Sequence, residues 1–262
     1  MRTVKTSTST STPNVSTLTR VLSFVHENLA KTADNVRPIE AGCIVSTPSL
    51  PAVWSVNQIR VARPLAFEAL IELAEEQLAT RYVHIVSENQ ETGPEAEQAF
   101  RGAGWKTERE VWMVLGGEPD RATDTSAVVD AGEDEVAELM RRWFAEEELD
   151  AGALDQLVEF SQREARACAD RLLGVRSSDG HLVAVCKLRS DGRTAQVEDV
   201  YTAPEARGRG FGRAVVARGV ELAREDGHDV IFITADDNDW PKELYGRIGF
   251  RPLGRIWQFH HD

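Results

Sequence analysis

Residues 200–213 read VYTAPEARGRGFGR and hold three arginines and three glycines between positions 207 and 213. A strand-like segment ends near Thr202, and the apolar stripe of a helix begins at Phe211. The first N–H groups of a helix have no partner within it, and the helix dipole adds positive charge there. Glycines in front of such a helix leave out the Cβ atoms that would keep a phosphate away. The stretch therefore predicts a turn that binds a pyrophosphate.

Two other glycine-rich phosphate loops do not fit this stretch. The dinucleotide fingerprint spaces its glycines G-x-G-x-x-G, but the glycines here fall at 208, 210 and 212, and position 213 is Arg213. The P-loop ends in Gly-Lys-Ser/Thr, which is absent. A glycine-rich turn that merely begins a helix remains the alternative to an anion site.

This turn and a second motif downstream resemble the GNAT superfamily of acetyltransferases. The family's phosphate loop reads Arg/Gln-x-x-Gly-x-Gly/Ala, and its downstream motif is an Asn, a Tyr seven residues later, and then Gly-Phe. The matching residues are Arg207, Gly210, Gly212, Asn238, Tyr245, Gly249 and Phe250. The resemblance covers residues 127–262 well and residues 19–117 weakly, and so is similar to a tandem GNAT arrangement.

The resemblance implies an α/β (α+β) fold of two GNAT-like mixed-sheet domains with helices on both faces. It also implies a V-shaped splay between the fourth and fifth strands of the C-terminal copy, the strands of Val200 and Val230. In the family, the pantetheine arm of acetyl-CoA enters such a gap. This implies pairing of the arm with backbone groups of Val200 and Thr202.

The site residues that the resemblance implies belong to acetyl-CoA binding and to catalysis. A strand N–H near Val200 would stabilise an oxyanion, and Tyr245 would act as the acid toward the leaving thiolate. The expected acetyl-CoA-binding residues are Val200, Tyr201, Thr202, Arg207, Gly208, Arg209, Gly210, Phe211, Gly212, Arg213 and Asn238.

The general base is a choice between two neighbouring carboxylates. Amine acetylation needs a neutral nitrogen, and a lysine-like amine is only about 0.04% neutral at pH 7, which is equivalent to roughly 4.6 kcal/mol. Glu198 and Asp199 lie on the strand expected to flank the thioester, and alternation places them on opposite faces. We favour Glu198 as the base because it shares the face of Val200, and Asp199 is the alternative.

The two halves of the chain repeat one pattern with an offset of 145 residues. Phe100, Gly104, Trp105 and Trp112 correspond to Tyr245, Gly249, Phe250 and Trp257. This spacing indicates a duplicated unit. The turn-rich segment 117–126 predicts the linker between the copies.

The predicted organisation is a disordered tail at residues 1–17, a degenerate GNAT-like domain at 18–117 and a catalytic GNAT domain at 127–262. The first copy has Phe100 where the second has Tyr245, so it lacks the acid. Between its expected strand and helix stands Ala62-Arg63-Pro64, without glycine. We therefore expect residues 19–117 not to bind acetyl-CoA.

Composition limits the classes of partner. The net charge of −13 and the pI of about 5.0 argue against nucleic-acid binding, and the chain has no apolar run long enough for a membrane span. The three cysteines form no CxxC pair, so we expect a cytoplasmic protein without a metal site.

Together these features predict an acetyl-CoA-dependent N-acetyltransferase that acts by direct attack in a ternary complex. The acceptor is a primary amine of a small molecule or a protein, and the protein is a monomer or a homodimer. The alternative is a non-catalytic acyl-CoA-binding or partner-binding module.

Overall fold

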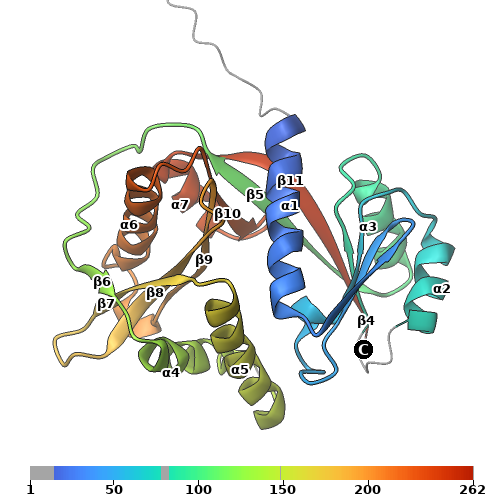
Figure 1. Ribbon diagram of the computed structural model, residues 1–262, viewed down its shortest axis with the longest axis horizontal. Coiled ribbons are helices and arrows are strands. Elements are labelled where there is room, and N and C mark those ends of the chain that lie inside the picture. Colours follow the sequence, from blue (N-terminus) through green and yellow to red (C-terminus); the bar gives the residue numbers. More distant parts are fainter. Residues whose placement is uncertain (1–14, 78–82, 148, 262) are drawn as a thin grey trace, which may run out of the picture.

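The computed structural model of the protein describes residues 15–77, 83–147 and 149–261 (Figure 1). The tail predicted for residues 1–17 lies outside these residues as far as position 14. Residues 15–17, which were assigned to that tail, belong to a helix.

Two halves follow one another along the chain. The first contains α1 (Val15–Thr32), β1 (Asn35–Ile39), β2 (Gly42–Ser46), β3 (Gln58–Val61), α2 (Phe67–Gln77), β4 (Val83–Ser87), α3 (Gly93–Gly102) and β5 (Lys106–Leu115). The second contains β6 (Val128–Asp130), α4 (Glu133–Phe144), α5 (Ala151–Ala167), β7 (Arg171–Arg176), β8 (Leu182–Ser190), β9 (Thr194–Thr202), α6 (Phe211–Glu225), β10 (Val230–Asp236), α7 (Pro241–Ile248) and β11 (Phe250–His261). The predicted linker 117–126 holds no helix or strand.

The segment between β2 and β3 is mostly loop. The described strand starts only at Gln58, after a short 3-10 helix at Trp54–Val56. The buried Asn57 holds this loop, because its Nδ2 donates to the carbonyls of Leu50 and Val53, both at 2.9 Å. A side chain that bonds to local backbone competes with the strand ladder.

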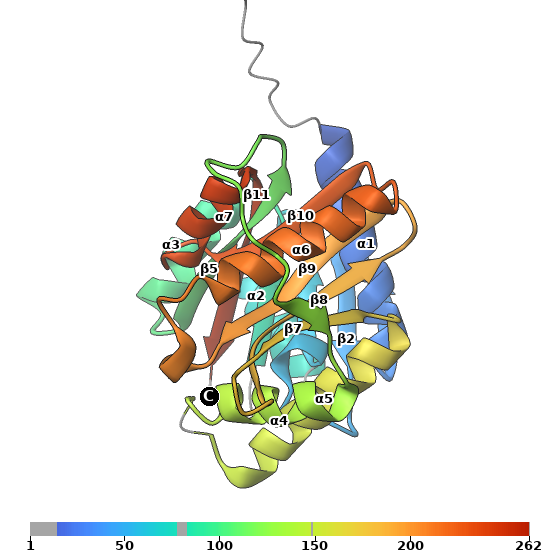
Figure 2. The same ribbon diagram turned by 90° about the vertical axis from the view of Figure 1, so that its left-hand side faces the viewer.

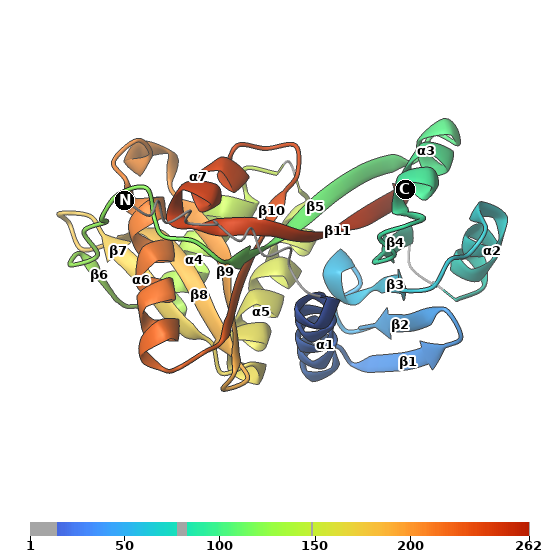
Figure 3. The ribbon, with the colours of Figure 1, turned by 90° about the horizontal axis from the view of Figure 1, so that it is seen from above.

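The strands form one continuous sheet rather than two separate ones. Its order is β1-β2-β3-β4-β11-β5-β10-β9-β8-β7-β6. The last strands of the two halves are exchanged: β5 pairs with β10, and β11 pairs with β4. Figure 3 shows β5 and β11 running side by side from one half into the other. The sheet is therefore not divided at the linker.

The pairing of the two exchanged strands follows the 145-residue repeat of the sequence. Within the antiparallel β5–β11 pair, Trp257 lies opposite Arg109, and Trp112 lies opposite Gly254. Residues 109 and 254 differ by 145, as do the two tryptophans. The two copies thus pair with each other like the two sides of a two-fold symmetric interface, which supports the duplication.

The splay predicted in the second half is confirmed. Parallel pairing between β9 and β10 ends at Val197 and Ile233, although β9 continues to Thr202 and β10 to Asp236. In the first half, the equivalent β3 and β4 are paired to their ends, at Val61 and Ser87. Among the described parallel strands, such a gap is found between β9 and β10 and not between β3 and β4.

Helices cover both faces of the sheet. In the second half, α6 packs on one face, and α4 with α5 packs on the other (Figures 1 and 2). Helix α1 lies where the halves meet, and its Phe24 packs with Trp112 and Phe232 in a shared core cluster. Among the described helices, none combines the length and apolar character needed to cross a membrane.

Candidate active site

The glycine-rich turn between β9 and α6 has the conformation that its sequence predicts. Gly208 and Gly210 have φ of 75° and 83°, in the left-handed region that favours glycine. Helix α6 begins directly after Gly210, and its first intrahelical bond is donated by Ala214 N. The N–H groups of residues 211–213 therefore lack helical partners. A Cβ at Gly208 or Gly210 would project into open space.

This turn opens into a cavity of about 720 Å³. Nine of the eleven predicted acetyl-CoA-binding residues line it: Val200, Tyr201, Thr202, Arg207, Gly208, Gly210, Phe211, Gly212 and Arg213. The cavity meets the fit requirements of a diphosphate site, because bare N–H groups face a space kept free by glycines. Arg209, which is outside the lining, stacks its guanidinium 4.9 Å from the centroid of the Phe211 ring.

Two of the arginines hold protein segments in place rather than offering free charge. Arg207 donates from Nε to the carbonyl of Thr202 at 3.0 Å and pairs with Glu146 at 3.1 Å. Arg213 is only 6% exposed and donates to Asp120 at 2.6 Å and to Thr123 at 2.8 Å. Its guanidinium fastens the linker to α6, so its contribution to the turn comes from the main-chain N–H.

Asn238 is not brought to this cavity, contrary to the expectation. It is exposed in the turn after β10, and its side-chain oxygen accepts from Arg109 Nη2 at 3.4 Å. The neighbouring Asp237 is buried and bonded to Arg255 at 2.8 Å. The motif spacing matched the family, but Asn238 contacts Arg109 of the first half, and the ion pair of Asp237 fixes the turn next to it.

A β-bulge changes the geometry of the two candidate bases. The β8–β9 register slips by one residue between Lys187↔Glu198 and Val185↔Tyr201, and Asp199 has a φ of +50°. Alternation therefore breaks, and Glu198 and Asp199 line the same second cavity instead of lying on opposite faces. The argument from alternation for Glu198 was wrong for this reason.

The two carboxylates differ instead in their bonding partners. Asp199 Oδ2 lies 2.6 Å from Nζ of the fully buried Lys187, so it is held in an ion pair. Glu198 Oε2 is buried and has no hydrogen-bond partner among the described residues. Glu198 is therefore the carboxylate that is free to accept a proton.

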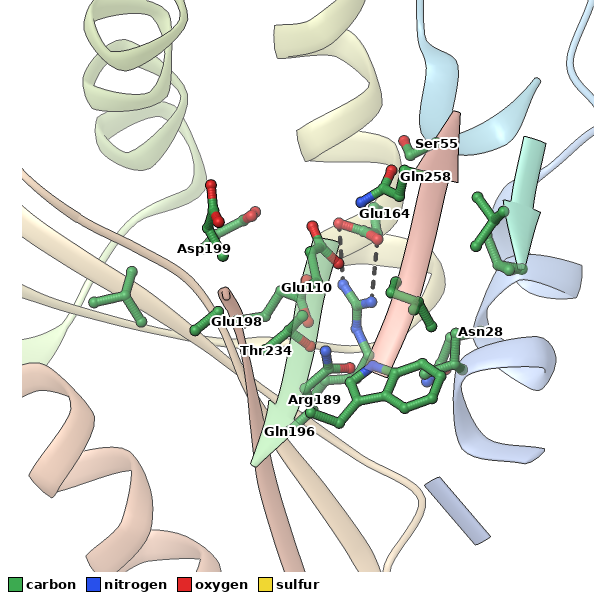
Figure 4. A pocket seen from close by; sticks show the side chains of 18 of the residues that line it. Asn28, Ser55, Glu110, Glu164, Arg189, Gln196, Glu198, Asp199, Thr234 and Gln258 are labelled. Carbon is green, nitrogen blue, oxygen red and sulfur yellow. Dashed lines mark hydrogen bonds and ion pairs between the residues drawn. The ribbon is translucent and has the colours of Figure 1, made fainter. Parts of the chain in front are cut away.

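The second cavity, of about 390 Å³, lies where the two halves meet (Figure 4). The second half contributes Glu164, Arg189 and Glu198, and the first contributes Asn28 and Glu110. Sequence motifs did not point to these junction residues, apart from Glu198. The one available signal was a pair of cations, Lys187 and Arg189, in an otherwise apolar strand.

The cavities share one wall, formed by Trp143, Val200, Pro241 and Tyr245. Tyr245 is 6% exposed, and no hydrogen-bond partner for its hydroxyl is found in the described part of the chain. Burial raises the pKa of this phenol, with further contributions from Cys186 and Glu198, so it stays protonated at neutral pH. A group that passes from one cavity to the other passes Tyr245.

Burial and neighbouring charges shift the pKa values of carboxylates in the second cavity, called the junction cavity below. Burial raises the pKa of Glu198 to about 8, and the neighbouring Asp199, Glu164 and Glu110 add to the shift against the opposing Arg189. Burial likewise raises the pKa of Glu110 to about 7. A base whose pKa lies near the operating pH is suited to proton transfer. Within the described residues, no group of three or more His, Cys, Asp or Glu is placed to hold a metal ion.

Comparison with known proteins places the glycine-rich turn in a wider group. Residues 134–250 match the family model described as acetyltransferase (GNAT) family. A mycothiol acetyltransferase of Clavibacter sepedonicus is 34% identical over 96 residues, which are 36% of this chain and 32% of that protein. The chain thus matches about a third of the length of this curated relative.

Solved structures share the fold over most of the chain. A GCN5-related N-acetyltransferase from Kribbella flavida has a TM-score of 0.59 at 17% identity, covering 92% of this chain and 94% of that one. A tandem GNAT protein from the clavulanic acid biosynthesis pathway has a TM-score of 0.51 at 15% identity, covering 77% and 74%. The second likeness extends to the arrangement of two GNAT units in one chain.

Proposed function

Since the chain belongs to the acetyltransferase (GNAT) family through residues 134–250, we propose that it transfers an acetyl group from acetyl-CoA to a primary amine of a small molecule or protein. The observation that carries this proposal is the wall shared by the two cavities. The glycine-rich turn lies in one cavity and Glu198 in the other, and Val200 and Tyr245 border both.

In this proposal the larger cavity holds coenzyme A. The N–H groups of residues 211–213 and the dipole of α6 bind the diphosphate. The edge of β9 beyond Val197 is not paired with β10, so its backbone groups are available to a pantetheine arm. Bound acetyl-CoA supplies an acetyl group activated as a thioester.

The residues around the shared wall divide the proton transfers. Glu198 takes a proton from the acceptor ammonium, which yields the neutral amine. As the nitrogen–carbon bond forms and the carbon–sulfur bond breaks, Tyr245 gives its proton to the departing sulfur. The nitrogen loses its second proton to solvent, from which Tyr245 is reprotonated, and Glu198 releases the first proton. Overall, an ammonium and a thioester become an amide, a thiol and one released proton.

Removing the phenol proton tests the role of Tyr245. In Tyr245→Phe the ring still packs, but no donor faces the sulfur, so we expect kcat to fall on the order of 10²-fold. The affinity for acetyl-CoA, measured by calorimetry, should stay unchanged, because the turn is untouched. Thiol release from acetyl-CoA in the presence of an amine reports kcat. An unaltered kcat would remove Tyr245 from the mechanism.

The first copy should not bind acetyl-CoA, so one molecule binds per chain. Its β3 and β4 are paired to their ends, which leaves no gap for the arm, and Ala62-Arg63-Pro64 offers no glycine turn. Calorimetric titration of the full chain should give a stoichiometry near one. A value near two would contradict this prediction.

A further inference from the structure

The junction cavity is lined mainly by polar side chains from both halves. Strands β5 and β11, the two exchanged strands, supply Glu110 and Gln258. Gln58 comes from β3 and Gln196 from β9, and both are at most 5% exposed. Gln58 donates to the Ser55 carbonyl and accepts from Arg60 at 3.3 Å. Gln258 Oε1 accepts from His84 at 2.9 Å, so these two amides make the wall polar while already being paired.

Most charges at the cavity are already paired. Arg189 bonds to Glu164 and Asp170, at 3.1 and 2.8 Å. Arg60 lies 2.5 Å from Glu88. These pairs bring little net charge to the cavity, so they do not decide which ligand it attracts.

Two carboxylates in the cavity, Glu110 and Glu198, form no salt bridge with a described residue, although Arg60 and Arg189 lie near them. Glu110 is hydrogen-bonded to Gln258, and Glu198 keeps a buried oxygen without a partner. Figure 4 shows both side chains directed into the same space. Partly buried carboxylates without a salt-bridge partner favour a cationic ligand.

The α1 wall carries an unused donor. Asn28 is 5% exposed, and its Nδ2 has no hydrogen-bond partner in the described structure, while its Oδ1 accepts from Lys31 at 3.1 Å. Asn28 lines the same cavity as Glu110 and Glu198. A buried amide N–H₂ of this kind needs an oxygen acceptor, and a ligand can supply one.

We propose that the junction cavity is the acceptor site for a small, hydrophilic primary amine, such as an amino sugar or amino polyol. This assignment of substrate class rests on the proposed acetyl transfer. The ammonium lies between Glu110 and Glu198, and Asn28 donates to a hydroxyl or carbonyl oxygen of the same molecule. The cavity volume of about 390 Å³ falls within the usual range of small-molecule sites.

The proposal gives the first half a function that does not require acetyl-CoA. By strand exchange, it places Glu110 beside Glu198 of the second half. Glu110 is thus an acceptor-binding residue contributed by the degenerate copy. An alkylamine would leave the Asn28 Nδ2 group unpaired, and the site discriminates against it for that reason.

The test uses the full chain with acetyl-CoA and matched amines. The first, glucamine, has a six-carbon chain with a hydroxyl on every carbon except that of the amine; the second is n-hexylamine; the third is the peptide Gly-Lys-Gly. Thiol release should give glucamine a kcat/KM at least tenfold above that of the other two. Equal or better use of hexylamine or the peptide would overturn the small hydrophilic acceptor while leaving acetyl transfer in place. No release with any amine would defeat both proposals.

Variants then test the named contacts. Glu110→Gln and Asn28→Leu should each raise the KM for glucamine about tenfold and leave the calorimetric affinity for acetyl-CoA unchanged. Glu95→Gln, an exposed position on α3 of the same half, is the matched charge control and should leave both values unchanged. Melting temperatures identify a variant that fails to fold, and the other variant then decides. An unchanged glucamine KM in a folded Glu110 or Asn28 variant would overturn the proposed contact.

Discussion

Replacing Gly210 by leucine is expected to abolish acetyl-CoA binding. A Cβ at this position would project into the open space in front of α6, where the diphosphate is proposed to lie. The larger side chain would then keep phosphate oxygens away from the N–H groups of residues 211–213. We expect Kd to rise at least 100-fold, which corresponds to about 2.8 kcal/mol. Calorimetry with acetyl-CoA measures this change.

The chain offers a matched control for the backbone strain in that variant. Gly227, just after the other end of α6, has a φ of 82° beside 83° at Gly210, and open space surrounds both. Gly227→Leu should lower the free energy of unfolding by a similar amount, about 1–2 kcal/mol, but leave acetyl-CoA affinity intact. Micromolar affinity in Gly210→Leu would contradict the assignment of the turn.

Replacing Glu198 by glutamine should remove the base. We expect kcat/KM for the amine at pH 7 to fall by about 10²–10⁴-fold, the usual contribution of a general base. Acetyl-CoA affinity should not change, because Glu198 does not line the larger cavity. The exposed Glu225, at the end of α6, provides the control Glu225→Gln. Loss of activity in both variants alike would point to a general effect of charge.

The same variant predicts a change in pH dependence. Activity requires the deprotonated carboxylate, so kcat/KM of the native protein should rise with pH up to about 8 and then level off. The groups that face Glu198 are Arg189, Asp199, Glu164 and Glu110, and their charges set this value. In Glu198→Gln the limb near pH 8 should be absent. The assay should use an acceptor amine whose pKa is near 10, so that the amine itself does not titrate near pH 8.

Stability should show the opposite trend with pH. The pKa of Glu198 is about 8 in the folded chain and about 4.3 when unfolded. Between these values the folded state binds more protons, so this group lowers the free energy of unfolding as pH rises. Denaturant titrations give the free energy of unfolding at each pH. The difference between Glu198→Gln and the native chain should shift in favour of the variant from pH 5 to pH 8. An equal effect at both pH values would contradict the raised pKa.

A single outcome would favour the non-catalytic alternative. Acetyl-CoA would raise the melting temperature, since it binds only the folded state, yet no amine would release thiol. In that case the two cavities would still meet at Tyr245, but Glu198 would have no proton to take. The paired measurements of binding and thiol release separate this outcome from an enzyme.

The local elements of this fold could be predicted because their signals are local. Helix α6 begins at Phe211, the residue at which the apolar stripe predicted a helix start. The glycine spacing specified the turn at 208–212. The missing glycines at 62–64 predict that the first copy lost the turn. Each of these inferences depends on residues that are close together in the sequence.

Features that depend on contacts between distant segments could not be predicted in this way. Strands β5 and β11 carry equivalent residues, so the sequence pattern does not tell which half each one joins. Pairing across the whole chain decided that, and with it the junction cavity and the place of Glu110. The bulge at Asp199 likewise follows from its register with β8 and reversed the argument from alternation. The sequence determined the glycine-rich turn that we propose binds a diphosphate, whereas only the tertiary structure decided what surrounds Glu198, because strand register and ion pairs are long-range.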